Sequence, residues 1–332
     1  MLARVADSIY WMSRYVERAE NVARFVEVNL NLMLDLPVGS EQQWQPLVDI
    51  SGDAAAFAKR YGAANQSNVI QFLTFDQENI NSIRSCLRAA RENARSVREI
   101  ISSEMWEQLN KFYLMVNSAA TGSQTDPQEL FASVKMARHL FTGVTDATMT
   151  HNESWHFCRL GRMLERADKT SRILDVKYFL LLPTVADVGT TSDDIQWAAV
   201  LRSASAFEMY RKCHGRIVPD RIVEFLLVQR DFPRAINYCL VRARECVHAI
   251  SGTPAGIFRY PVERLLGEIC SELAYARIES IITAGLHEYL DGLQTSINQV
   301  GNGISETFFA ARGAPPVRKK ATQRPAGVQF AV

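Results

Sequence analysis

The sequence lacks several features that mark common functional classes. Its six cysteines are scattered without a C-x-x-C pair, and no histidine lies at zinc-finger spacing from them. Reduced core thiols are therefore expected, not a disulfide framework or a zinc finger. No apolar run reaches the roughly 18 residues that span a bilayer, and the N-terminal segment lacks the apolar core of a signal peptide. These absences predict a soluble, cytoplasmic protein without membrane contact.

Strong net charge and a phosphate-binding loop are also missing. The formal net charge is only +1, so no global field attracts nucleic acid. Gly252 and Gly256 lie in S-G-T-P-A-G-I, which has no preceding strand and no following Lys-Ser or Lys-Thr pair, as a P-loop would require. We expect neither a cofactor nor a nucleic-acid partner.

No stretch alternates apolar and polar residues between hairpin turns, whereas apolar residues recur every three or four positions along most of the chain. This periodicity predicts an all-α fold built as an antiparallel bundle of long helices. The helical domain should cover residues 1–311, and its division into two related halves, 1–150 and 151–311, is a further hypothesis. Residues 312–332 are rich in proline, glycine and basic residues, which is typical of a disordered tail.

Capping residues and breakers divide the chain into long helical segments. Asp76 is expected to cap one helix, Ser102 another, and Asp126-Pro127 a third. Asp231-Phe232-Pro233 is expected to start a fourth. The longest predicted helices cover 2–35, 104–118, 127–148, 152–181, 195–213, 262–283 and 286–310.

One motif occurs twice, first near the N-terminus and again 148 residues later. Both copies read Arg-x-x-Glu-Arg-Ala-acid-x-x-x-Arg. The first copy runs from Arg14 to Arg24, and the second runs from Arg162 to Arg172. An internal repeat of this kind suggests two related helical halves.

A helical wheel separates the apolar and charged positions of each copy. The first apolar stripe, which includes Met12 and Val16, has its counterpart in Leu160 and Leu164 of the second. The acids fall on one flank of the stripe, where the i,i+4 spacing of Glu20 to Arg24 and of Asp168 to Arg172 favours ion pairs. Four arginines lie further round and are expected on the outer face: Arg14, Arg18, Arg162 and Arg166.

Three roles fit such a stripe of arginines and acids. It can be a salt-bridge lattice that joins helices, a surface whose spare arginine donors bind a carboxylate, a phosphate or a peptide terminus, or a pair of acid/base catalysts at Glu17 and Glu165. Because no nucleophile or base can be placed beside the acids, no catalytic residue is assigned. The candidate binding residues are Arg14, Glu17, Arg18, Glu20, Arg24, Arg162, Glu165, Arg166, Asp168 and Arg172.

Two Glu-x-x-His motifs raise the alternative of a metal site. They begin at Glu153 and at Glu245, and a di-iron helical bundle uses two such motifs with two further glutamates. Glu153 falls at a helix start, however, and nothing in the sequence brings the two motifs together. We assign no metal ligand.

The segments Met1–Asn21 and Leu160–Arg172 resemble the bacterial alpha-E family, which is named for an all-helical domain with a Glu-Arg (ER) motif. Shorter matches lie in Ala89–Arg95, in Trp106–Asn110 and in Asp231–Arg234. The resemblance covers about residues 1–310. It is compatible with the helical fold that the periodicity predicts.

The resemblance implies an association with particular partners and no reaction of its own. Such proteins are typically encoded beside a circularly permuted ATP-grasp ligase and a transglutaminase-like peptidase. We therefore expect a non-enzymatic helical partner or scaffold of a peptide or amide ligase system, which binds the ligase or its peptide substrate through the ER face. A peptide-modifying transferase or hydrolase is the alternative, and homo-oligomerisation is possible.

Overall fold

The computed structural model describes residues 1–35, 44–122, 126–180 and 191–310. Within these ranges the chain is entirely helical and contains no strand, so the all-α prediction is confirmed. None of these helices is long and apolar enough to cross a membrane. The predicted tail, residues 312–332, lies outside the described ranges.

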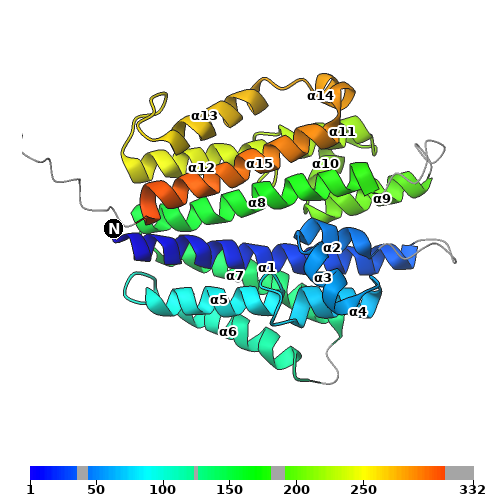
Figure 1. Cartoon of the computed structure of the whole chain (residues 1–332), viewed down its shortest axis with the longest axis horizontal. Coiled ribbons are helices and arrows are strands. Elements are labelled where there is room, and N and C mark those ends of the chain that lie inside the picture. Colours follow the sequence, from blue (N-terminus) through cyan, green and yellow to red (C-terminus); the bar gives the residue numbers. More distant parts are fainter. Residues whose placement is uncertain (36–43, 123–125, 181–190, 311–332) are drawn as a thin grey trace, which may run out of the picture.

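Two long helices lie side by side through the centre of the molecule: α1 (Ala3–Asp35) and α8 (Glu153–Leu180) (Figure 1). Contacts between them keep a nearly constant spacing in sequence. Met1 contacts Glu153, and Arg14 contacts Glu165. The two helices therefore run parallel, whereas each runs antiparallel to its outer neighbours.

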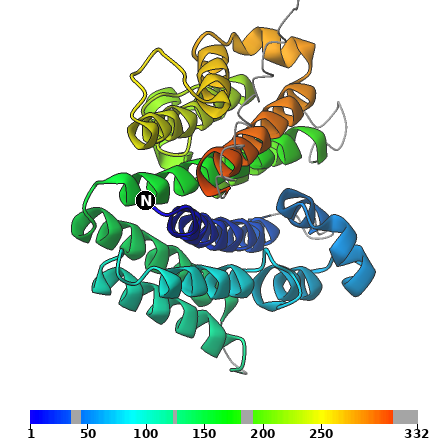
Figure 2. The same cartoon turned by 60° about the vertical axis from the view of Figure 1, so that its left-hand side comes forward.

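The order of elements after α1 resembles the order after α8. Mostly shorter helices come first. Of the three longer helices in each group, two pack against the central helix and the third packs on those two. Below α1 in Figure 1 lie the longer helices of the first group, and above α8 lie those of the second; Figure 2 shows the same two layers from another side. The division into halves 1–150 and 151–311 stays a prediction, with which this order agrees.

The remaining elements have the following bounds. After α1 come α2 (Gln45–Ser51), α3 (Ala54–Tyr61), α4 (Gln66–Ile70), a π-helical turn η1 (Gln71–Phe75), α5 (Ile83–Ser96), α6 (Ser103–Ala119) and α7 (Pro127–Thr148). After α8 come α9 (Thr191–Ser203), α10 (Phe207–His214), α11 (Pro219–Leu227), α12 (Ile236–Ser251), α13 (Pro261–Ala274), α14 (Ile278–Ala284), α15 (Leu286–Ile304) and a π-helical turn η3 (Ser305–Phe309).

The core register of the two motif helices is as predicted. Both apolar stripes are buried over their whole length, because α1 and α8 face each other and are covered on their other sides. Their backbones meet at Gly161, where an added Cβ atom would lie 2.4 Å from the carbonyl oxygen of Tyr10. Only glycine permits this approach without a shift of one helix.

Several predicted helix boundaries are wrong. The helix expected from Asp76 begins at Ile83. The side chain of Ser82 caps it by accepting a hydrogen bond from the backbone N–H of Ser85, while Asp76 stabilises the preceding loop. The helix expected over 195–213 is two helices, with a break at Ser205, whose φ is +52°. Similarly, 262–283 divides into α13 and α14.

The helix expected from Asp231 begins only at Ile236. Pro233 and Arg234 precede it in a turn. The carbonyl oxygen of Pro233 accepts a hydrogen bond from Arg166. This turn therefore lies against the motif segment of α8, and it brings Arg234 to the centre of the molecule.

Candidate functional site

The two motif copies bind each other through reciprocal ion pairs. Glu17 of the first copy accepts a hydrogen bond of 2.6 Å from Nε of Arg166 in the second. Glu165 of the second copy accepts one of 2.7 Å from Nε of Arg18 in the first. Glu17 and Glu165 occupy the same motif position, as do Arg18 and Arg166. Because α1 and α8 run parallel, the glutamate of each motif pairs with the arginine of the other, as in a local two-fold arrangement.

Glu165 is held by two arginines of α1. Arg18 donates to both of its carboxylate oxygens, at 2.7 and 3.0 Å, and Arg14 donates from Nε at 2.9 Å. The Glu165 side chain has no exposed surface. Burial alone would raise the pKa of this carboxyl, but the two guanidinium groups outweigh burial and hold the pKa well below its usual range.

Glu17 is surrounded by cations from three other elements. Besides Arg166, it binds Arg138 of α7, whose Nε lies 2.9 Å from Oε2. Nη1 of Arg234 lies 3.7 Å from Oε1. All four side chains are buried, so this cluster joins α1, α7, α8 and the turn before α12.

The second acids of the two copies differ in their partners. Glu20 pairs with Arg24 of its own helix and with Arg234, whose Nη2 lies 2.6 Å from Oε2. Among the described residues, the ion-pair partners of Asp168 both lie on its own helix, Arg172 at 3.0 Å and Lys169 at 3.3 Å. We call the four acids Glu17, Glu20, Glu165 and Asp168, together with these cationic partners, the ER cluster.

The prediction that the four arginines lie on the outer face is wrong. Arg14 and Arg18 turn inward to Glu165, and Arg166 is buried against Glu17. The helical wheel places them away from the stripe of their own helix, but the parallel partner helix covers that side. Arg162 also lies mostly inside, with Nη2 at 3.8 Å from Asp146.

Arg138 and Arg234 were not predicted as members of the site. Arg138 lies on α7 without any motif in its surroundings, so the sequence holds no signal for it. Arg234 follows Asp231-Phe232-Pro233, one of the segments that resemble the alpha-E family. That resemblance is the one signal that could have drawn attention to it.

The ER cluster is poorly suited to acid/base catalysis. Its carboxylates are paired with guanidinium groups, and these cations outweigh the opposing effect of burial and keep the pKa of both Glu20 and Glu165 low. A general base at neutral pH needs a pKa near the working pH. The surrounding thiols are equally unreactive, since burial raises the pKa of Cys239 and of Cys86 to about 12.

The two Glu-x-x-His motifs do not form a common ligand set. Glu153 pairs with the N-terminal amino group, and Glu245 pairs with Arg242. In the described part of the chain, no three His, Cys, Asp or Glu side chains come together where they could hold a metal ion. The ligand geometry of a di-iron bundle is therefore absent from these residues.

The molecule has a second polar feature, an open groove between α12 and α13. Two hollows of about 920 and 520 Å³ adjoin there and share Arg244 and Ser271. Arg244 is half-buried and has no ion pair with any residue that the structure describes. Exposed apolar side chains stand at the two ends, Phe258 at one and Tyr275 at the other.

The repeated motif and the all-helical fold agree with one protein family. Its model, named Alpha-E and described as a predicted alpha-helical domain with a conserved ER motif, matches residues 1–309. The chain belongs to the Alpha-E family. In this Alpha-E chain the ER motifs are the segments that form the reciprocal ion pairs.

Among curated proteins, this Alpha-E chain is similar to uncharacterized proteins of Mycobacterium bovis and of two strains of Mycobacterium tuberculosis. Each is 23% identical over 337 residues, covering 93% of this chain. The chain spans only 37% of the length of these relatives. No solved structure matches it.

Proposed function

We propose that this protein is a non-enzymatic helical scaffold that serves as a partner of an ATP-grasp peptide or amide ligase system. The observation that carries the proposal is that each of the four buried motif carboxylates is paired with at least one cation. Such pairing stabilises a rigid framework and leaves no free base. The relatives support a role beside other proteins, because the matched region occurs there as part of much longer chains.

The ER cluster acts in this proposal as the clasp that joins α1 and α8. A macromolecule cannot reach side chains that are buried between two helices, so the clasp holds the scaffold and does not itself form the docking face. The groove between α12 and α13 is the better docking face, because it is open and ends in exposed aromatic side chains. Its half-buried Arg244 would pair with a carboxylate of the ligase or of its peptide substrate.

Co-expression with an ATP-grasp ligase of the same organism, followed by size-exclusion chromatography, tests this proposal. The two proteins should elute together, and Arg244→Glu should separate them by opposing the partner's carboxylate. Arg95→Glu is the matched control, because Arg95 is an exposed arginine of α5 outside the groove. Two separate peaks for the unchanged proteins, at every concentration and salt level, would contradict the proposal.

The alternative enzyme role makes a different prediction. A transferase or hydrolase that uses Glu17 and Glu165 would turn over a peptide without any partner, and Glu165→Gln would abolish that turnover while the fold persisted. The scaffold proposal predicts no turnover by the purified chain alone.

A further inference from the structure

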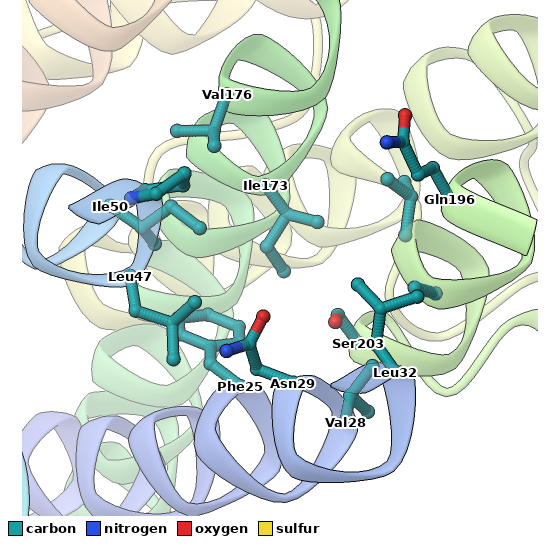
Figure 3. Close-up of a pocket in the computed structure, with 13 residues that line it drawn as sticks. Phe25, Val28, Asn29, Leu32, Leu47, Ile50, Ile173, Val176, Gln196 and Ser203 are labelled. Carbon is teal, nitrogen blue, oxygen red and sulfur yellow. The ribbon is translucent and has the colours of Figure 1, made fainter. Parts of the chain in front are cut away.

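A pocket lies between the two motif helices, beyond the ER cluster. Its cavity volume is about 60 Å³. In Figure 3, α1 lies below the pocket and α8 above it, with α2 on one side and α9 on the other. Phe25 and Val28 of α1 face Ile173 and Val176 of α8, which occupy the corresponding positions in the repeat. The walls are thus mainly aliphatic and follow from the same duplication as the motifs.

One polar group in this wall lacks a hydrogen-bond partner among the residues with described positions. Asn29 is only 6% exposed, and its Nδ2 atom donates no hydrogen bond to any described residue. Figure 3 shows its amide reaching into the pocket from α1. A buried amide donor without an acceptor is unfavourable, so most such groups in folded proteins are satisfied by protein, water or ligand.

A bound water is a poor solution to this imbalance. An ordered buried water needs two to four polar partners. Most of the lining is apolar, including Phe25, Leu47 and Ile173, and besides Asn29 only Gln196 and Ser203 among the lining residues are polar (Figure 3). A ligand with a hydrogen-bond acceptor next to an aliphatic group would accept the hydrogen bond from Asn29 and pack its aliphatic part against the apolar walls. The volume, about 60 Å³, is below the roughly 150 Å³ of a cavity that takes benzene. This size favours a branched aliphatic group over an aromatic ring.

We propose that the pocket binds a leucine-like group, a branched aliphatic side chain with an adjoining amide carbonyl. The aliphatic part lies between Phe25 and Ile173, and the carbonyl oxygen accepts the hydrogen bond from Nδ2 of Asn29. A leucine or isoleucine residue within a peptide has this chemistry. The proposal stands on the pocket alone, so it goes beyond the scaffold role and does not depend on the ligase partner.

The full chain and the small probe N-acetyl-leucine amide provide the test. Saturation-transfer NMR should show saturable binding of this probe. N-acetyl-lysine amide has the same carbonyls but a charged side chain, and it should show none. The absence of saturable binding of the leucine probe, or equal binding of both probes, overturns the proposal.

Variants locate the binding in this pocket. Asn29→Leu keeps the shape and removes the donor, so it should weaken binding roughly tenfold. Asn31→Leu, an exposed asparagine on the same helix, is the matched control and should leave binding unchanged. Unchanged binding by the Asn29→Leu protein would contradict the assignment.

Two further measurements keep the test independent of folding defects. Asn29→Leu should raise the melting temperature of the free protein by a few degrees, because it removes an unsatisfied buried donor. Ser203→Phe, from the α9 wall, should fill the pocket and abolish binding while the helical circular dichroism stays unchanged. Saturable binding that survives Ser203→Phe would place the probe elsewhere and overturn the proposal.

Discussion

The two ER motifs have nearly the same sequence but different surroundings. In the first copy, Glu17 and Glu20 both bind arginines from outside α1. In the second copy, Glu165 binds arginines of α1, whereas the partners of Asp168 in the described part of the chain are neighbours on its own helix. The comparison teaches that a motif fixes which side chains are present, while the elements packed against each copy decide which partners each acid finds.

The largest expected effect is at Glu165. Glu165→Ala leaves Arg14 and Arg18 buried beside each other without their carboxylate, and breaking a buried pair costs about 3–5 kcal/mol. Urea denaturation should show this loss in the free energy of unfolding. The control Glu92→Ala removes an exposed acid and should cost less than about 0.5 kcal/mol. Equal small losses would place Glu165 in a solvated surrounding.

Acidification should weaken the first copy through Glu20. Burial would raise the pKa of this carboxyl, but Arg234 and Arg24 lower it from 4.5 to about 2. The unfolded chain therefore binds a proton at a higher pH than the folded chain does. The contribution of Glu20, on the order of 3 kcal/mol, is fully present above about pH 4.5 and is lost as the pH falls toward 2.

Unfolding free energies measured by urea denaturation between pH 6 and pH 2 check this dependence. Glu20→Gln should show a shallower decline than the unchanged protein, because its side chain does not titrate. Parallel pH profiles for the two proteins would contradict the low pKa of Glu20.

A smaller effect on stability is expected at Gly161, where the backbones of α1 and α8 approach each other closely. Gly161 corresponds to Ser13 of the first copy, and a Cβ atom added at Gly161 would lie 2.4 Å from the backbone carbonyl oxygen of Tyr10. Gly161→Ala should separate the helices and cost about 1–3 kcal/mol, as overpacking does. Gly143→Ala on α7, where nothing lies within 4 Å of an added Cβ, should instead stabilise by up to about 1 kcal/mol. Thermal denaturation distinguishes the two signs.

The smallest effects are expected at the last motif arginines. After Arg24→Ala, the buried Glu20 keeps only Arg234, and a loss of about 1–2 kcal/mol is expected. Arg172 is 25% exposed and its partner Asp168 keeps Lys169, so Arg172→Ala should cost about 0.5–1 kcal/mol. Chemical denaturation of both variants measures the difference. A larger loss for Arg172→Ala would reverse the comparison of the two copies.

Much of the fold could be predicted because it rests on local patterns. The apolar stripe of α1 and the cap at Asp126 are visible within a few turns of sequence, and both are confirmed. The break at Ser205 has no comparable signal, because neither glycine nor proline marks it. The apolar periodicity runs on through the break, so it predicts one continuous helix over 195–213.

The site was predicted less completely, for a physical reason. A helical wheel describes one helix and cannot show which helix covers its polar flank. Arg18 was therefore placed outside although α8 lies there, and Arg138 was missed because its role depends on the antiparallel packing of α7 against α1. The pairing of the two copies required their relative orientation, which the sequence does not state.

The central claim is that the ER motifs form a reciprocal clasp between α1 and α8. A double-mutant cycle on Arg18 and Glu165 tests this claim most directly. Arg18→Met, Glu165→Leu and the double variant should be compared by urea denaturation. We predict that the double variant loses less free energy of unfolding than the two single variants together, by at least about 2 kcal/mol. Each single variant leaves one buried charge without this partner, whereas the double variant removes both charges. Losses that add to within about 0.5 kcal/mol would contradict the clasp.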